Sequence, residues 1–282
     1  MSMSDKKRIR RWLLSAVYTL GIVGIVASGG GGGGDDSASV SFPTPTLPAG
    51  AVTLDGGNAQ EVAESVLELA SVLSSFTQFK TVTPPTIPDV LKLVTDWIIQ
   101  NSRSSRSLVN GVTEDLSALI CPNGGKAIAN YSESDSSETG TITYTDCNIG
   151  AGILISGTAS YDVSWNDATL DYDYRFGGTL TIDFGTDTFT VVFNLSEVGN
   201  DGTGAFSSNI DYSVDGIPGG GLLVNTTQAW EGDFSGFTSG QFIVYGGSNT
   251  RLRITVVPGN MADVELDDGG GTFMYITTIP II

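Results

Sequence analysis

The chain has 282 residues, with 13 Lys and Arg against 31 Asp and Glu, two Cys and no His. The absence of histidine excludes Ser-His-Asp and Cys-His catalysis and imidazole-based zinc sites, and two cysteines cannot form a four-thiolate zinc site. The formal net charge of −18 repels phosphate backbones, so we expect no nucleic-acid partner.

Residues 1–28 have the pattern of an export signal. The basic stretch Lys6–Arg11 precedes an apolar run, Trp12–Ala27, that is short for a membrane-spanning helix. We expect cleavage after Ala27 or Ser28. The alternative is an uncleaved leader that anchors the protein in the membrane.

The stretch Ile25–Ser28, followed by Gly29–Asp36, resembles the start of many Gram-negative bacterial lipoproteins, in which a Cys, a glycine run and acidic residues follow the leader. Asn58–Ala63, and Cys121–Gly125 together with Asp146–Asn148, are similar to uncharacterised exported proteins of the same kind. The resemblance implies an extracytoplasmic location in a Gram-negative bacterium: the periplasm, the outer membrane or the medium. Because position 28 is Ser and has no thiol for a lipid, it implies a soluble exported or leader-anchored form, and it transfers no activity.

Two helical patterns follow a Gly/Ser/Pro-rich flexible linker predicted for residues 29–57. Asn58 and Glu61 have the spacing of a capping box. The apolar stripe that follows consists of Val62, Val66, Leu69, Leu73 and Phe76. After Pro88, a second stripe consists of Val90, Leu91, Val94, Trp97 and Ile98. We expect this helical segment, residues 58–107, to pack on a sheet; a partner-binding or membrane-binding face is the alternative.

From residue 108 to residue 282 the apolar pattern changes to alternation. Runs such as Tyr161–Trp165, Leu170–Phe176 and Phe189–Leu195 place apolar residues at every second position, and Gly, Asn and Asp separate the runs. This pattern predicts a mainly β fold, an antiparallel meander of about 10–12 strands that forms a half-barrel or a closed barrel. The two amphipathic helices would pack on it.

Turn residues and side-chain parity predict the register of three consecutive hairpins. The predicted turns are Asn166-Asp167, Gly177–Thr179 and Gly185–Thr188. They would oppose Val163 to Leu170, Tyr174 to Ile182, and Ile182 to Val191. The other face would then carry a ladder of opposed acids: Asp162, Asp171, Asp173 and Asp183. A solvated acidic face is the favoured interpretation; weak Ca binding and a carboxylate-dependent hydrolase are the alternatives, and no other metal or cofactor is expected.

Two features near the ends of the β region predict structural contacts. Export favours a disulfide between Cys121 and Cys147, because oxidising compartments preserve such bonds; a redox pair is the alternative. A turn at Pro258–Asn260 predicts a last hairpin with cross-strand ion pairs. Its expected opposed pairs are Ile254 with Val264, Arg253 with Glu265, and Arg251 with Asp267.

Five aromatic residues are candidates for an apolar-ligand site on the concave face of the sheet: Tyr161, Trp165, Tyr172, Phe184 and Phe193. A filled core explains them equally well and is the default. Because no catalytic group is identified, we expect a non-catalytic exported module that is structural, or that binds an apolar small ligand or a cell-envelope partner. The alternatives are an outer-membrane transmembrane β-barrel and a secreted hydrolase, and membrane contact is expected only through an uncleaved leader or such a barrel.

Overall fold

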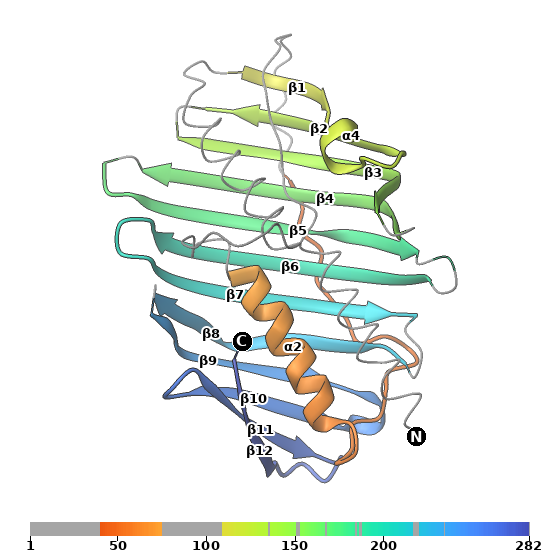
Figure 1. Ribbon diagram of the computed structural model, residues 1–282, viewed down its shortest axis with the longest axis vertical. Helices are drawn as coiled ribbons and strands as arrows, with labels where there is room; N and C mark the ends of the chain where they lie inside the picture. Colours follow the sequence, from red (N-terminus) through yellow and green to blue (C-terminus); the bar gives the residue numbers. More distant parts are fainter. Residues whose placement is uncertain are drawn as a thin grey trace.

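The computed structural model describes residues 40–74, 109–134, 136–150, 153–166, 168–183, 185, 188–216, 220–233 and 235–281. These residues contain one 12-stranded antiparallel sheet whose strands are ordered as in the sequence (Figure 1). The predicted β-rich meander is thus confirmed. The strands are β1 (Val109–Asp115), β2 (Lys126–Glu133), β3 (Ser137–Gly150), β4 (Ile153–Asn166), β5 (Asp171–Asp183), β6 (Thr188–Asn200), β7 (Ala205–Asp215), β8 (Leu222–Asp233), β9 (Gly236–Tyr245), β10 (Arg251–Val257), β11 (Met261–Asp267) and β12 (Met274–Pro280).

The sheet is open, so of the two predicted forms, a half-barrel or a closed barrel, the closed barrel is wrong. A barrel requires its first and last strands to hydrogen bond, whereas β1 and β12 are the two edges of the described sheet. Both edges carry features that limit further pairing. β1 has a register shift between Val109 and Val112, with Gly111 at a φ of 69°, and β12 ends at Pro280, which has no N–H to donate.

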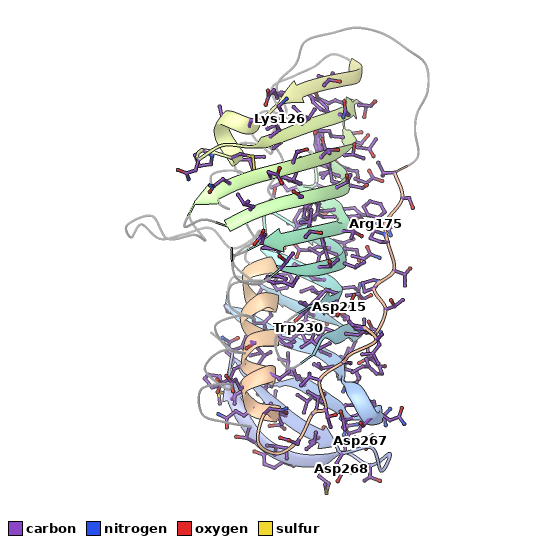
Figure 2. The ribbon with its side chains drawn as sticks, turned by 90° about the vertical axis from the view of Figure 1, so that its right-hand side faces the viewer. Lys126, Arg175, Asp215, Trp230, Asp267 and Asp268 are labelled. Carbon is purple, nitrogen blue, oxygen red and sulfur yellow. A yellow bond between two sulfur atoms is a disulfide. The ribbon has the colours of Figure 1, made fainter. Side chains whose placement is uncertain are left out.

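Alternation gives the sheet one buried and one more exposed face. In β6, Phe189, Val191, Phe193 and Leu195 are buried, and the residues between them are half-buried. We call the buried face, which packs against helix α2, the helix face. The opposite face is the strap face, because residues 40–54, the strap, cross it. Figure 2 shows the helix and the strap on opposite sides of the sheet.

Helix α2 (Ala59–Ser74) confirms the first predicted helix, and it packs against β10, β11 and β12. The predicted capping box is replaced by a different turn. The carboxylate of Asp55 accepts the N–H groups of Gly57 (2.7 Å) and Asn58 (3.1 Å). Asp55, three residues before Asn58, therefore binds the backbone N–H groups just before the helix begins. The side chain of Asn58 instead donates to the carbonyl of Thr53 at 3.0 Å.

The fold differs from the prediction of two long N-terminal helices, since α2 is the one such helix in the described residues. The second predicted helix, with its stripe from Val90 to Ile98, lies outside them. A short helix, α4 (Ser117–Ile120), and a 3₁₀ turn, η1 (Gly247–Asn249), complete the described helical elements. Across these described ranges, no helix has the length and apolar character needed to cross a membrane.

The strap runs over the strap face and ends at the tips of β9 and β10. The ring of Phe42 lies 4.4 Å from the guanidinium carbon of Arg175 on β5. At its other end, Leu54 is 1% exposed, and its N–H donates to Thr250 Oγ1 at 2.9 Å. Part of the predicted flexible linker, residues 40–57, therefore packs against the sheet, because apolar side chains anchor it; residues 29–39 lie outside the described residues.

The registers predicted for three central hairpins are wrong. Val163 faces Tyr174, and Asp162 faces Arg175, four residues beyond the predicted partners. β5 continues through Gly177–Thr179, where a turn was expected. Ile182 faces Phe189 and not Val191.

Local geometry explains two of these differences. Asn166 Oδ1 accepts the N–H groups of Ala168 and Thr169, and Leu170 has a φ of 63°, so the first turn is longer than two residues. Residue 178 lies inside the strand and is a glycine because a Cβ at this position would lie 2.4 Å from the carbonyl oxygen of Thr158 on β4. This glycine thus reflects a close approach between two backbones and not a turn.

The last hairpin confirms the prediction in full. Arg253 faces Glu265, and Arg251 faces Asp267, as the turn after Val257 requires. Arg253 bonds Glu265 through both Nε (2.5 Å) and a terminal nitrogen (2.8 Å), and its guanidinium lies 4.4 Å from the ring of Phe273. Arg251 donates to one carboxylate oxygen of Asp267, Oδ2. The second oxygen, Oδ1, accepts the backbone N–H groups of Gly269 and Gly271, so this acid also stabilises the turn that follows.

The predicted disulfide is present. Cys121, directly after α4, is bonded to Cys147 on β3, 26 residues away in the sequence. Both sulfur-bearing residues are buried, at 4% and 0% exposure. The bridge therefore joins the two ends of the β2–β3 hairpin near the β1 edge of the sheet.

Removing this bridge should lower the stability of the fold. For a loop of this size we expect a cost of roughly 3 kcal/mol, because the unfolded chain regains the entropy that the cross-link removes. Urea unfolding of the wild type with and without dithiothreitol measures it. The double variant Cys121→Ala/Cys147→Ala is the control: its midpoint should match that of the reduced wild type and should not respond to dithiothreitol. An unchanged wild-type midpoint after confirmed reduction would contradict the expectation.

Candidate functional site

The four predicted acids do not form a ladder of opposed carboxylates. They share the strap face, but Asp162 faces Arg175, Asp171 faces Asn166 and Asn200, and Asp173 faces Ser164 and Val198. Asp183 lies at the far end of β5, facing Leu154 and Thr188. No group of three or more acids among the described residues is placed to hold a metal ion.

The five aromatic candidates separate into different environments. Tyr161 and Phe193 are core residues of the helix face, at 0% and 2% exposure. Trp165 and Tyr172 face each other near the β4–β5 turn and are half-buried. Phe184 lies outside the described residues. A ligand could therefore reach the aromatic side chains at one end of the strands, whereas the middle of the face is packed core.

Three buried glutamates lie on this same helix face. They lie in one row of directly opposed residues that crosses five neighbouring strands, β2 to β6. The row consists of Glu133, Glu138, Val163, Tyr174 and Glu197, in that order. The glutamates are 7%, 3% and 8% exposed. They form two separate groups, because β4 and β5 lie between Glu138 and Glu197.

The first group surrounds Glu138. Its Oε1 accepts the hydroxyl of Tyr161 at 2.6 Å, and Gly140 leaves the space that the Tyr161 ring needs to reach it. Burial raises the pKa of Glu138 to about 7, a net value that includes the lowering effect of the Tyr161 hydrogen bond and the smaller raising effects of the Glu133 and Glu114 charges. Burial also raises the pKa of Glu133, whose Oε1 is a buried atom with no hydrogen-bond partner in the described part of the chain.

The second group surrounds Glu197. One carboxyl oxygen accepts the hydroxyl of Tyr172 at 2.8 Å, and the other bonds the hydroxyl of Ser208 on β7. Burial raises the pKa of Glu197 to about 7, although both hydrogen bonds lower it. Burial and the nearby Glu197 charge raise the pKa of Tyr174, which therefore stays neutral. The Tyr172 hydroxyl can lie over β6 and reach Glu197 because residue 199 is glycine, where a Cβ would lie 2.2 Å from this hydroxyl.

A small cavity lies against Glu197. Its volume is ≈ 20 Å³, and its walls include Tyr174, Leu195, Glu197, Ser208 and Ile210. The β7–β8 pairing is interrupted here, between Ser208 and Tyr212. The hydroxyl of Thr226 on β8 replaces the lost ladder bond by accepting the Ile210 N–H at 2.7 Å. The cavity itself is lined by residues of β5, β6 and β7, and it is large enough for about one water molecule.

This geometry does not fit carboxylate-pair hydrolysis. Glu138 and Glu197 are separated by three strand spacings, roughly 14 Å, whereas glycosidase pairs lie about 5–9.5 Å apart. Glu133 and Glu138 are neighbours, but at 7% and 3% exposure they admit no sugar-sized substrate between them. The Glu197 cavity, with one carboxyl group, hydroxyl donors and apolar walls, is better suited to binding.

The glutamates were missed because the apolar runs were followed only as far as their last apolar residue. Glu197 continues the alternation of Phe189, Val191, Phe193 and Leu195, and Glu133 continues that of Ala127, Ala129 and Tyr131. The sequence therefore did contain a sign of these residues: a glutamate at a position where the alternation along the strand predicts a buried side chain. No known protein family, curated protein sequence or solved structure shows significant similarity to this chain.

Proposed function

We propose that the protein is a non-catalytic exported module that binds an apolar ligand at the end of the helix face near the β4–β5 turn. The leader supports export, and the disulfide is compatible with an oxidising compartment. The site itself is the aromatic strip, defined as Val163, Trp165, Tyr172 and Tyr174. One observation carries the proposal: these side chains are half-buried, and one of them, Tyr174, lines the Glu197 cavity, whereas the next row of the same face is packed core.

The size of the cavity limits how a ligand binds. Drug-sized ligands occupy pockets of about 300–1,000 Å³, far more than the ≈ 20 Å³ beside Glu197. The apolar body of the ligand would therefore lie along the aromatic strip, and one terminal group would enter the cavity. An unbranched alkyl chain fits this arrangement, because it presents a narrow end and an apolar side.

The two alternatives depend on features that the described sheet does not supply. A membrane-spanning barrel must be closed so that no strand edge faces lipid, and the described sheet is open. A hydrolase based on the predicted acids needs opposed carboxylates, and Asp162 faces Arg175 instead. The binding proposal depends on neither feature.

Titration with 1-hexanol by isothermal calorimetry tests the proposal. We expect saturable binding, and at least a fivefold loss of affinity in Trp165→Ala, because the indole supplies part of the apolar contact. Tyr275→Ala is the control, since this residue is 61% exposed on β12, far from the strip, and its loss should leave the affinity unchanged. Absence of binding, or equal losses in the two variants, would overturn the proposed function.

A further inference from the structure

We infer that the terminal group held in the Glu197 cavity is a primary ammonium group, so that the ligand is an amphiphilic amine with an unbranched apolar body. This inference rests on the proposed function and specifies the ligand of the same site. The argument depends on the size of the cavity, the hydrogen-bond capacity of Glu197, and the charge of the walls.

The size of the cavity selects a group of one heavy atom. A volume of ≈ 20 Å³ accommodates one water-sized group, which includes an ammonium head but not a guanidinium, a phosphate or a sugar ring. A methyl group is equally small. It would, however, leave the carboxylate of Glu197 without a donor on the cavity side.

Glu197 retains acceptor capacity for such a head group. Each oxygen of an ionised carboxylate can accept about two hydrogen bonds. In this site one oxygen accepts from Tyr172 and the other from Ser208. One acceptor position therefore remains on each oxygen. An ammonium group can fill such a position, because each of its N–H groups is a hydrogen-bond donor. Such charge-assisted hydrogen bonds are about twice as strong as neutral ones.

The charge of the walls also favours a cation. Glu197 is 8% exposed, and no residue lining the described cavity is basic. Ionised Glu197 thus lacks a counter-charge within the cavity, and an ammonium group supplies it. Tyr174 forms another wall and is uncharged. The net charge of −18 attracts cationic ligands to the protein and repels fatty acids of the same chain length.

Binding of the amine should be linked to loss of a proton. The titratable groups that contact or face Glu197 from β5 are Tyr172, which donates its hydroxyl to the carboxyl, and Tyr174, which stays neutral, and β7 contributes the hydroxyl of Ser208. The carboxyl of Glu197, with a pKa of about 7, is mostly protonated at pH 5.5 and ionised at pH 8. Because an alkylammonium keeps its charge over this range, its affinity should rise roughly 30-fold between these two pH values.

Calorimetry with hexylammonium chloride and 1-hexanol at pH 8 tests the inference on the disulfide-bonded protein. We expect hexylammonium to bind at least tenfold more tightly than hexanol. In Glu197→Gln, which keeps the size of the side chain, the two affinities should become equal. Glu138→Gln is the matched control: it removes another buried carboxyl from the same face, and the preference for the amine should persist.

The outcomes separate the two proposals. If hexanol binds but hexylammonium binds no more tightly, or if Glu197→Gln keeps the preference, the inference is overturned and the apolar site remains. If Glu138→Gln abolishes the preference equally, the amine is responding to the charge of the whole face, which also overturns it. If neither compound binds, the proposed function itself fails.

Discussion

The free energy of unfolding should fall by several kcal/mol as the pH rises from about 5 to about 8. Glu138 and Glu197 have ordinary pKa values near 4.5 when unfolded, and burial raises both to about 7 in the fold. A raised acid pKa means that the folded state holds its proton more tightly. The stabilisation is therefore complete below pH 4.5 and is lost as the pH rises through 7, at a cost on the order of 3 kcal/mol for each glutamate.

Urea unfolding at pH 5 and pH 8 measures this dependence. In Glu138→Gln and Glu197→Gln the neutral amide cannot ionise, so each variant should lose about half of the pH dependence, and the double variant should lose most of it. The exposed acid Glu231 provides the control, because Glu231→Gln should follow the wild type. Equal pH dependence in the wild type and the double variant would contradict the prediction.

The opposite trend should appear in acid. Hydrogen bonds from Arg253 lower the pKa of Glu265, and those from Arg251 lower that of Asp267. A lowered pKa gives stability that is present above the unfolded value, near 4, and is lost as the pH falls through the folded value. The two opposing trends place the maximum of stability at about pH 4.5.

Truncation of Trp230 should cause a large loss in the free energy of unfolding. The side chain is fully buried on the helix face; its ring lies 4.5 Å from that of Phe242 and 4.9 Å from that of Phe237, measured between centroids. It packs over Gly240, whose φ of 147° and short distance to the indole admit no side chain. Trp230→Ala should therefore cost about 3–5 kcal/mol, measured by urea unfolding at pH 5.

Trp230→Phe separates packing from hydrogen bonding. The indole Nε1 is buried and has no hydrogen-bond partner within the described ranges. Removing an unpaired buried donor recovers about 1–3 kcal/mol, which offsets part of the lost contact. We expect Trp230→Phe to cost less than half as much as Trp230→Ala. A cost as large as that of the alanine variant would show that Nε1 does bond to a partner in solution.

Much of the fold follows from the sequence because its signals are local. Alternation fixes which residues share a face, and this was correct along β4, β5 and β6. The β10–β11 register was also correct, since a Pro-Gly-Asn turn and two opposite-charge pairs agree on one alignment. Where the turn was ambiguous and no charge pair confirmed it, as at Asn166, the predicted register differed by four residues.

The candidate site was less accessible to sequence reasoning, for a physical reason. Residues that build it are far apart in the chain: Tyr172 and Glu197 are 25 positions apart, and Glu138 and Tyr161 are 23 apart. Their proximity depends on how neighbouring strands are aligned. The alternation of apolar residues shows which face a side chain lies on, but it does not determine this alignment. The exposed acids were conspicuous in the sequence, whereas the buried glutamates acquire their unusual pKa only from the packing around them.

The path of the strap has a consequence for the order in which the chain folds. Every strand of the described sheet pairs with its neighbours in sequence, so the sheet can grow hairpin by hairpin from local contacts. The bond from Leu54 to Thr250, in contrast, spans 196 positions, and α2 rests on β10, β11 and β12. The N-terminal segment, although made first, must therefore wait for the last strands, and docking of the strap and α2 would be the step that completes folding.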